Sequence, residues 1–573
     1  MKISKHQLKI LLLQLLLMLT FSANANYVLK DSINSYLNYA EKQFRYNVNA
    51  NTDITKFVRG YSPTTNALRL VSASDWTSGF YPGIMWLLYD YSGDEFWRNK
   101  ALVYTNSMNG QQITSGDHDI GFKILGGYGN AYKYMSKDSF ASVIVTASKK
   151  FEKIYSPIVG CTRSWFHTPS RVPSLFKPTK FPVIIDNMMN IELLAKGTIL
   201  SNDSRFINIA KQHALTTSVN HIRLDSSTYH IVEYEPTTGI SRWRGTQQGY
   251  DHETTWSRGQ AWGIYGYTMM YRYTNEIEML KTAKKLAAYF IKNTPEDGIV
   301  PYDFNLPTTL TEAQRSKDVS ASCIAASAFI ELFSFTGDSV YLKQAEKILF
   351  VLSKSPYRSS LQSNGNFILT QFTAGRDYNV NESVNYADYY YLETLLKYAQ
   401  LSNAYEPRKH RPEVKNELNY TCKIGQELSD SIRFYDFDGQ NVTCSMDNNL
   451  YAGSVNYTVV NNRITFIFSK TGIYNFPIRI SDANHTATET IKITVDAATG
   501  ISKVNNSDNW KFTYQPSIKL LSVVGDILPP YKIYNLMGCN VLMSLIPEID
   551  VCALSRGLYI LKTSSGESRK FII

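Results

Sequence analysis

The chain has 573 residues, which is too long for one ordinary domain and indicates two to four. Hydrophobic residues make up 44% of the chain, enough for packed cores, and this excludes wholesale disorder. The formal net charge of +10 suits an anionic partner, but the sequence contains no basic stripe and no known nucleic-acid module, so we expect no nucleic-acid binding.

The first 25 residues have the pattern of a signal peptide. Three lysines precede an apolar stretch from Ile10 to Phe21, and residues 23–25 are the small-residue sequence Ala-Asn-Ala that a signal peptidase reads. The alternative is a membrane anchor, but the stretch is shorter than the roughly 20 residues that a spanning helix needs. We therefore expect an exported protein, either periplasmic or secreted to the cell surface, with no later membrane-spanning segment.

Residues 26–402 repeat one unit, in which an apolar helix, a short turn and an amphipathic helix follow one another. The turns are Gly93-Asp94, Lys137-Asp138, Asn202-Asp203, Asn275-Glu276 and Gly337-Asp338. Their Gly, Asn and Asp residues supply the left-handed and capping conformations of a helical hairpin. Residues 388–400 and 31–47 can pair as a sixth hairpin.

Six hairpins predict an all-α (α/α)6 barrel, and an open helical solenoid is the alternative. The aromatic and polar motifs fall at helix starts and in loops. A closed barrel would bring them together at one mouth, which favours closure.

The composition and the pattern of apolar residues change after residue 402. Residues 403–412 are rich in Pro, Lys and Arg and predict a linker. Alternating apolar and polar residues then predict a β-sandwich over 413–497 and a β-rich C-terminal domain over 510–573. Two cysteine pairs can form disulfides in an exported protein. They are Cys422 with Cys444, and Cys539 with Cys552.

Two aspartates are candidates for acid–base chemistry. Asp119 stands before a helix in the sequence Asp-His-Asp-Ile-Gly-Phe, and Asp186 interrupts an apolar run. Burial would raise the pKa of Asp186 and keep it partly protonated, as a general acid requires. The alternative for both is a helix-capping carboxylate. The spacing of His and Cys residues predicts neither a metal nor another cofactor.

Other motifs offer sugar contacts. Trp76 presents a flat ring, and Trp256, Arg258 and Trp262 lie within seven residues, so that the arginine could bind a carboxylate between two stacking surfaces. Ser383 opens a tract rich in Tyr and Asn whose hydroxyl and amide groups suit a sugar. For each motif the alternative is packing or helix capping.

Six motifs occur in an order that resembles one enzyme family. They are DWTSGFYPG, HDIGF, IIDNMMN, QGYDHETTWSRGQAWG, DVSASCIAASAFIEL and NYADYYYLE. Over roughly residues 30–402 the chain resembles the unsaturated glucuronyl hydrolases of glycoside hydrolase family 88. Residues 413–497 resemble an Ig-like or PKD-like module, and the segment ending at Ile573 is similar to the sorting domains of type IX secretion.

The resemblance implies an (α/α)6 barrel enzyme that removes a 4,5-unsaturated uronic acid from lyase-generated oligosaccharides. It assigns protonation of C4 to Asp186 and contacts with the 2- and 3-hydroxyls to Asp119. Its substrate contacts fall on His118, His230, Gln248, Arg258 and Trp262. At Gln247 the family often has His, a difference that bears on fine substrate preference. The implied partners are an unsaturated acidic oligosaccharide and, through the C-terminal domain, secretion machinery.

Two alternatives to this function stay open. An unsaturated rhamnogalacturonyl hydrolase or another (α/α)6 enzyme would share the barrel, although the rhamnogalacturonyl branch usually has Asn-Gly in the tract from Arg258 to Trp262. A glycan-binding protein without catalytic activity could use the same tryptophans and arginine.

Overall fold

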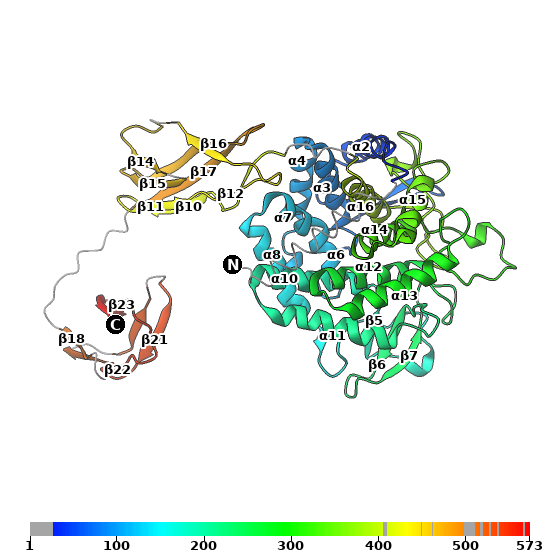
Figure 1. Ribbon diagram of the computed structural model, residues 1–573. Helices are drawn as coiled ribbons and strands as arrows, with labels where there is room; N and C mark the ends of the chain where they lie inside the picture. Colours follow the sequence, from blue (N-terminus) through cyan, green and yellow to red (C-terminus); the bar gives the residue numbers. More distant parts are fainter. Residues whose placement is uncertain are drawn as a thin grey trace.

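The computed structural model describes residues 27–404, 410–447, 450–460, 462–497, 510–515, 519–525, 529–535, 538–564, 566 and 568–573. The predicted signal peptide lies outside the described residues, as do residues 405–409 of the predicted linker. A large helical domain is followed by two groups of β-strands (Figure 1).

Within the described residues, the helical domain contains six inner helices, each accompanied by an outer helix. The inner helices are α3 (Phe80–Ser92), α6 (Ile120–Ile124) continued by η1 (Leu125–Gly129) and α7 (Asn130–Met135), α9 (Asn187–Asn190) continued by α10 (Glu192–Ser201), α12 (Ser257–Thr274), α14 (Val319–Thr336) and α16 (Asn385–Leu401). The outer helices are α2 (Ile33–Ala50), α4 (Glu95–Ser107), α8 (Asp138–Glu152), α11 (Ser204–Asn220), α13 (Ile277–Asn293) and α15 (Ser339–Leu352).

Burial separates the two sets of helices. α3 and α14 are buried on almost every side, while α13 buries a single stripe of residues at helical spacing. The predicted turns join inner to outer helices. Four inner helices end on a left-handed Gly or Asn, namely Gly93, Asn202, Asn275 and Gly337. Three outer helices begin with a capping aspartate, namely Asp94, Asp203 and Asp338.

The last inner helix closes the ring. α16 packs between α14 and α3, and α2 packs against it from outside. At its start, Asn385 donates hydrogen bonds to the carbonyl oxygens of Val58 (3.2 Å) and Thr77 (3.1 Å). Near its end, the Tyr398 hydroxyl accepts from the backbone of Leu29 (3.0 Å). The closed (α/α)6 barrel is therefore confirmed, and the open solenoid is excluded.

Small sheets and loops surround the end of the barrel where the inner helices begin. One sheet has the order β2-β1-β8 and the other the order β5-β6-β7. Their strands are β1 (Phe57–Ser62), β2 (Ala67–Val71), β8 (Ser383–Val384), β5 (Phe181–Ile184), β6 (Ile231–Tyr234) and β7 (Ser241–Gly245). The shorter connecting elements are α5 (Gln111–Thr114), β3 (Tyr155–Ser156), β4 (Cys161–Thr162), η2 (Ser174–Phe176), η3 (Ala313–Arg315) and η4 (Asn364–Asn366).

α14 corrects one expectation from the sequence. It is long and apolar enough to cross a membrane by length and composition, although no such segment was expected after the first 25 residues. Most of the helix is buried inside the barrel, where it packs between α12, α15 and α16. Its apolar composition is that of an inner helix surrounded by other helices.

The β-strands after residue 412 form two groups. The first has the sheets β10-β17-β16-β13 and β11-β15-β14 and the pair β12-β9, and the second has β18-β19-β22 and β21-β20-β23-β24. The first group comprises β9 (Glu413–Val414), β10 (Asn419–Lys423), β11 (Glu427–Ser431), β12 (Phe434–Tyr435), β13 (Thr443–Met446), β14 (Val455–Val460), β15 (Arg463–Phe468), β16 (Gly472–Ser481) and β17 (Thr486–Asp496). The second comprises β18 (Trp510–Gln515), β19 (Leu520–Gly525), β20 (Tyr531–Tyr534), β21 (Asn540–Ser544), β22 (Glu548–Asp550), β23 (Leu558–Lys562) and β24 (Ser568–Ile572).

The predicted disulfides are not present. All six cysteines are free in the structure. Cys422 on β10 and Cys444 on β13 lie on opposite outer strands of one four-stranded sheet, so two strands separate them. Strands lie about 4.8 Å apart, and a disulfide needs its two Cα atoms within about 7 Å. Cys539 and Cys552 flank β21 and β22, which belong to different sheets.

A buried ion pair attaches the first β group to the helical domain. Arg98 on α4 donates from Nε to Oε1 of Glu413 on β9 and from Nη2 to Oε2, the latter at 2.6 Å. His410 Nε2 lies 3.1 Å from the carbonyl oxygen of Tyr89 at the end of α3.

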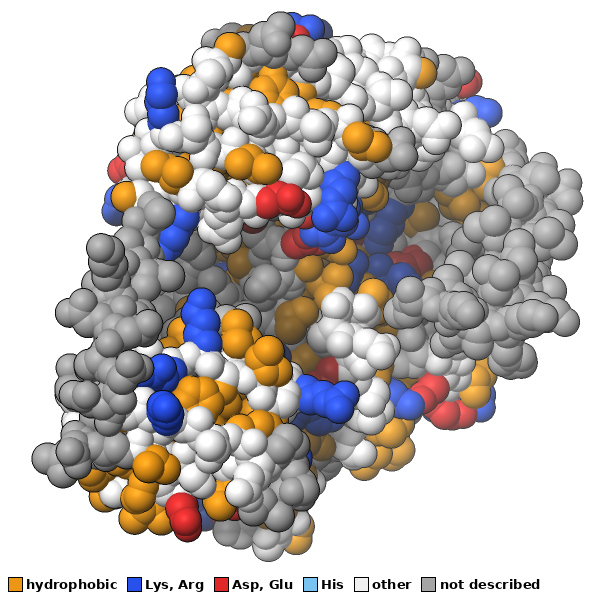
Figure 2. Space-filling view, turned by 90° about the vertical axis from the view of Figure 1, so that its left-hand side faces the viewer, with side chains coloured by type: hydrophobic (Ala, Val, Ile, Leu, Met, Phe, Trp, Pro, Cys, Tyr) orange, Lys and Arg blue, Asp and Glu red, His pale blue; other side chains and the backbone are white. Residues whose placement is uncertain are grey.

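Among the described residues visible in Figure 2, Lys and Arg side chains are scattered rather than gathered in a stripe.

Candidate active site

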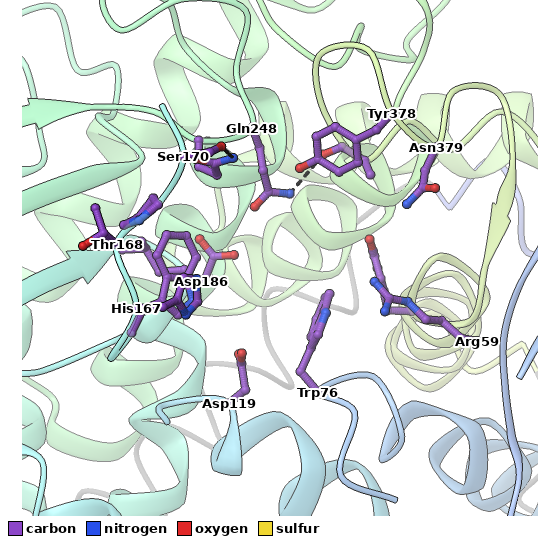
Figure 3. Close-up of a pocket in the computed structure, with 16 residues that line it drawn as sticks. Arg59, Trp76, Asp119, His167, Thr168, Ser170, Asp186, Gln248, Tyr378 and Asn379 are labelled. Atoms are coloured by element: carbon purple, nitrogen blue, oxygen red, sulfur yellow. Dashed lines mark hydrogen bonds between the residues drawn. The ribbon is translucent and has the colours of Figure 1, made fainter. Parts of the chain in front are cut away.

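A pocket of about 510 Å³ opens at the mouth of the barrel (Figure 3). Its sixteen lining residues are Arg59, Trp76, Asp119, Trp165, His167, Thr168, Pro169, Ser170, Ile184, Asp186, Gln247, Gln248, Ala374, Tyr378, Asn379 and Tyr386. The starts of α3, α6, α9 and α16 all contribute to it. Four of the predicted site residues therefore meet in one cavity, namely Trp76, Asp119, Asp186 and Gln248.

The two aspartates stand at helix starts without capping them. Asp119 occupies the position before α6 and Asp186 the position before α9, and neither side chain accepts a hydrogen bond from its own helix. Both carboxyl groups are therefore available to the pocket. Figure 3 shows them on the same side of Trp76. The capping alternative raised by the sequence does not account for either residue.

A close contact joins the two helices whose starts carry the aspartates. The backbone of α6 approaches Asn190 of α9 so closely that a Cβ on Gly121 would lie 2.6 Å from the Asn190 Cα atom. Asn190 also accepts a hydrogen bond from the backbone N–H of Phe122 (2.7 Å). Only glycine leaves room for this approach. The Gly121–Asn190 contact therefore sets how α6 and α9 pack, and with it the positions of Asp119 and Asp186 at their starts.

Burial changes the acidity of both groups. Removal from water raises the pKa of Asp186 to about 7, and the neighbouring Asp119 carboxylate contributes to the rise. Burial also raises the pKa of Asp119, with the charge of Asp117 acting in the same direction. The two neighbouring carboxyl groups therefore share one proton near neutral pH, and the group that holds the proton is in the state that a general acid needs.

His230 contacts Asp186 rather than the pocket. Its Nδ1 accepts hydrogen bonds from the backbone N–H groups of Gln247 (3.2 Å) and Gln248 (3.4 Å), so the proton of the neutral ring resides on Nε2. Nε2 lies 3.7 Å from Asp186 Oδ2. Burial lowers the pKa of His230 well below its usual value, so the ring is neutral. It acts on the carboxyl group as a fixed dipole, and it is not among the residues that line the pocket.

His118 has the same relation to the other carboxyl group. Its Nε2 lies 3.5 Å from Asp119 Oδ1, and the ring is fully buried. Burial lowers the pKa of His118, so this ring too is neutral. The structure places it behind the pocket wall and not among the lining residues.

Four further predicted contacts are absent from the pocket wall. Trp256 and Trp262 are almost completely buried, with the Trp256 ring 4.4 Å from His230 and the Trp262 ring 5.2 Å from Phe122. Ser383 is buried and donates to the carbonyl oxygen of Leu369 (2.8 Å). Arg258, the fourth, is buried as well. The side chains of Trp256 and Trp262 belong to the core that supports the pocket.

The predicted carboxylate-binding arginine is already occupied. Arg258 is 1% exposed and forms a buried ion pair with Asp318 at the start of α14. Its Nη1 also donates to the carbonyl oxygen of Thr373 (3.1 Å), and its Nη2 donates to that of Ala374 (2.7 Å). Arg258 therefore ties α12 to α14 and to the loop at 373–374.

We expect Arg258→Ala to destabilise the protein by about 3–5 kcal/mol, because it leaves Asp318 buried without its partner. Chemical denaturation followed by circular dichroism measures this change. A variant of wild-type stability that has only a raised KM would contradict the structural role and restore the predicted contact with substrate.

Several lining residues were not predicted from the sequence. Trp165 and His167, whose rings stack at 5.6 Å, come from the loop between β4 and β5, and Tyr378 and Asn379 come from the loop before β8. Gln248 donates a hydrogen bond to the carbonyl oxygen of Ala374 (3.0 Å), which links the loop before β8 to the site. The aromatic residues in these long loops were the available signal.

No group of three or more His, Cys, Asp or Glu side chains that could hold a metal ion occurs among the described residues. The site consists of two carboxyl groups of raised pKa, an aromatic platform and polar side chains. It is suited to proton transfer on a small ring that stacks on Trp76.

Comparison with known proteins identifies relatives of the helical domain. No protein-family model matches the chain. An unsaturated glucuronyl hydrolase of Formosa agariphila is 37% identical over 360 residues, which are 62% of this chain and 88% of that relative. One of Bacillus sp. is 31% identical over 346 residues, 59% of this chain and 89% of that relative.

Solved structures agree with the sequence relatives. An unsaturated glucuronyl hydrolase specific for heparin has a TM-score of 0.60 and 34% identity, over 65% of this chain and 98% of its own. The enzyme from Bacillus sp. GL1, described as responsible for the degradation of glycosaminoglycan, has a TM-score of 0.56 and 27% identity, over 64% of this chain and 96% of its own. Fold and sequence agree over the helical domain, and the chain belongs to the unsaturated glucuronyl hydrolases, glycoside hydrolases that act on unsaturated uronyl glycosides.

Proposed function

We propose that this chain removes the 4,5-unsaturated uronic acid from the non-reducing end of short acidic oligosaccharides by adding water across the double bond. The observation that carries the proposal is the pair Asp119 and Asp186, two uncapped carboxyl groups of raised pKa that share a pocket with Trp76. A pocket of about 510 Å³ suits a ligand of one or two sugar rings.

In the proposed mechanism, Asp186 donates its proton to C4 of the unsaturated ring. The electrons of the C4=C5 bond form the new C4–H bond, and positive charge develops at C5 and the ring oxygen. A water molecule adds at C5 and returns a proton to the Asp186 carboxylate. The resulting hemiketal opens and releases the second sugar. Because the anomeric carbon is not attacked, the carboxylate spacing rule of ordinary glycosidases does not apply.

The other residues have supporting roles in this mechanism. Asp119 binds the 2- and 3-hydroxyls, and its charge keeps the pKa of Asp186 high. His230 Nε2 lies 3.7 Å from Asp186 Oδ2, so the neutral ring places a dipole beside the carboxyl group that donates the proton. Gln248, on the opposite side of the pocket from Trp76 in Figure 3, orients the sugar or the water.

The test is a spectrophotometric assay. The conjugated double bond of an unsaturated uronic acid absorbs in the ultraviolet, and hydration removes this absorbance. We expect the purified protein to bleach unsaturated disaccharides, that is, to remove their ultraviolet absorbance. Heparin and chondroitin disaccharides come first, because relatives are named as specific for heparin and as unsaturated chondroitin disaccharide hydrolases. A folded protein that bleaches none of them and still binds them would be a glycan-binding protein.

A rhamnogalacturonyl substrate is the second candidate within the same reaction class. The tract from Arg258 to Trp262 lacks the Asn-Gly typical of that branch. We therefore expect unsaturated rhamnogalacturonan disaccharides to be bleached more slowly than glucuronyl substrates.

We also propose that the protein is exported and that its C-terminal strands engage secretion machinery. The pattern of the first 25 residues and the resemblance of the C-terminal segment to type IX sorting domains support this proposal. Fractionation of cells producing the chain with and without residues 510–573 tests it. Retention of the shortened form in the periplasm is the expected result.

A further inference from the structure

Arg59 is the single Lys or Arg among the sixteen residues that surround the pocket. It lies on β1, in the hairpin that precedes the Trp76 motif. In Figure 3 it lies beside Asn379 on one side of Trp76, and Asp119 and Asp186 lie on the other. The pocket therefore has an acidic wall and a basic wall with an aromatic platform between them.

The guanidinium group is held in place but not enclosed. Its Nη1 pairs with Asp75 Oδ2 at 2.9 Å, and the other oxygen of Asp75 accepts from the backbone and hydroxyl of Thr77 (2.8 and 2.6 Å). Asp75 is therefore fixed, and it fixes Arg59. The Arg59 side chain stays 27% exposed, whereas that of Arg258 is 2% exposed. Arg59 can still accept a ligand, and Arg258 cannot without breaking its ion pair.

The distance to the platform suits a stacked sugar. Arg59 Cζ lies 6.0 Å from the centre of the Trp76 ring. A guanidinium N–H group reaches an acceptor oxygen at about 4 Å from Cζ. A sugar ring stacked on Trp76 therefore brings its exocyclic substituents within the range of Arg59. An arginine offers paired donors that match the oxygens of a carboxylate or a sulfate.

We infer that Arg59 binds an oxyanion of the substrate on the wall opposite the catalytic carboxyl groups, and so takes the role that the sequence had assigned to Arg258. This inference rests on the proposed function. The bound group is either a sulfate on the second sugar or the carboxylate of the unsaturated ring, and both present the same chemistry to a guanidinium group.

The test compares Arg59→Gln with wild type on two unsaturated disaccharides, one without sulfate and one with a sulfate on the second sugar. Loss of a charge-assisted contact should raise KM roughly 10- to 100-fold, with kcat within about threefold. A rise confined to the sulfated disaccharide assigns Arg59 to the sulfate, and an equal rise on both assigns it to the carboxylate.

The matched control is Arg69→Gln. Arg69 lies on β2 of the same hairpin and pairs with Glu382, outside the pocket. We expect its KM to equal that of wild type. An unchanged KM for Arg59→Gln on both substrates, or an equal rise in the Arg69 variant, would overturn the inference. If wild type bleaches neither disaccharide, the proposed function fails, and calorimetric titration of both disaccharides into wild type and Arg59→Gln still tests the binding role.

Discussion

Asp186→Asn is expected to lose nearly all turnover of unsaturated disaccharides, because the amide cannot donate the proton that C4 must receive. General acid catalysis contributes roughly 100- to 10,000-fold to a rate, and the loss should fall in that range or beyond it. The ultraviolet assay measures it directly. A variant that keeps more than about a tenth of wild-type activity would remove Asp186 from this role.

The fold of this variant should survive. Asp186 does not cap its helix, and its Oδ2 atom is buried without a hydrogen-bond partner. A folded-state pKa raised to about 7 means that the stability present below the unfolded pKa of 3.8 is lost as pH rises toward and through 7. An uncharged asparagine avoids that loss, so thermal unfolding at pH 8 should show Asp186→Asn at least as stable as wild type.

Asp203→Asn is the matched control for the chemistry of the substitution. Asp203 also precedes a helix, but it caps the outer helix α11 away from the pocket. Asparagine caps as well as aspartate, so we expect wild-type activity and nearly unchanged stability. A large loss of turnover in this control would mean that the assay reports general damage rather than loss of the acid.

Asp119→Asn is expected to move the pH profile as well as to slow the reaction. The Asp119 carboxylate raises the pKa of Asp186, so its removal lowers that pKa. Because the general acid must be protonated, kcat/KM falls as pH rises through the pKa of Asp186, which is about 7 in wild type. In the variant this fall should begin at lower pH, by on the order of one unit.

The measurement is kcat/KM for both proteins between about pH 4.5 and 9. The loss of contacts to the 2- and 3-hydroxyls should lower the plateau by a further factor of roughly 100, because both hydrogen bonds are made to a charged group. If the alkaline limb stays in place or moves to higher pH, Asp119 does not control the acidity of Asp186.

The barrel could be predicted from the sequence because its signals are local. A left-handed Gly or Asn followed by a capping residue identifies a hairpin such as the one at Gly93 without any tertiary information. The two aspartates could be predicted for a related reason, since each interrupts or precedes an apolar helix. What the sequence could not settle was whether these carboxyl groups cap their helices, because that depends on the conformation of one side chain.

The substrate contacts were harder to predict because burial depends on the whole fold. Arg258 and Arg59 are both arginines near tryptophans, and the sequence favoured Arg258 because of its richer surroundings. In the structure, those surroundings are the core, and Asp318, sixty residues later, neutralises Arg258. The loops that carry His167 and Tyr378 have no helical periodicity, and their aromatic residues alone do not place them over the pocket.

The Gly121–Asn190 contact belongs to only one of two parts of the site, so the geometry of proton transfer and the substrate preference can change independently. Reaction chemistry depends on helices whose crossing tolerates no added side chain, whereas the opposite wall comes from a hairpin and from surface loops. Substitutions in the hairpin and loops can alter which sugar is accepted while the proton-transfer geometry stays the same. Exchanging β1, β2 and the loop before β8 between relatives is therefore a route to new substrate preferences without a change in the helices that carry Asp119 and Asp186.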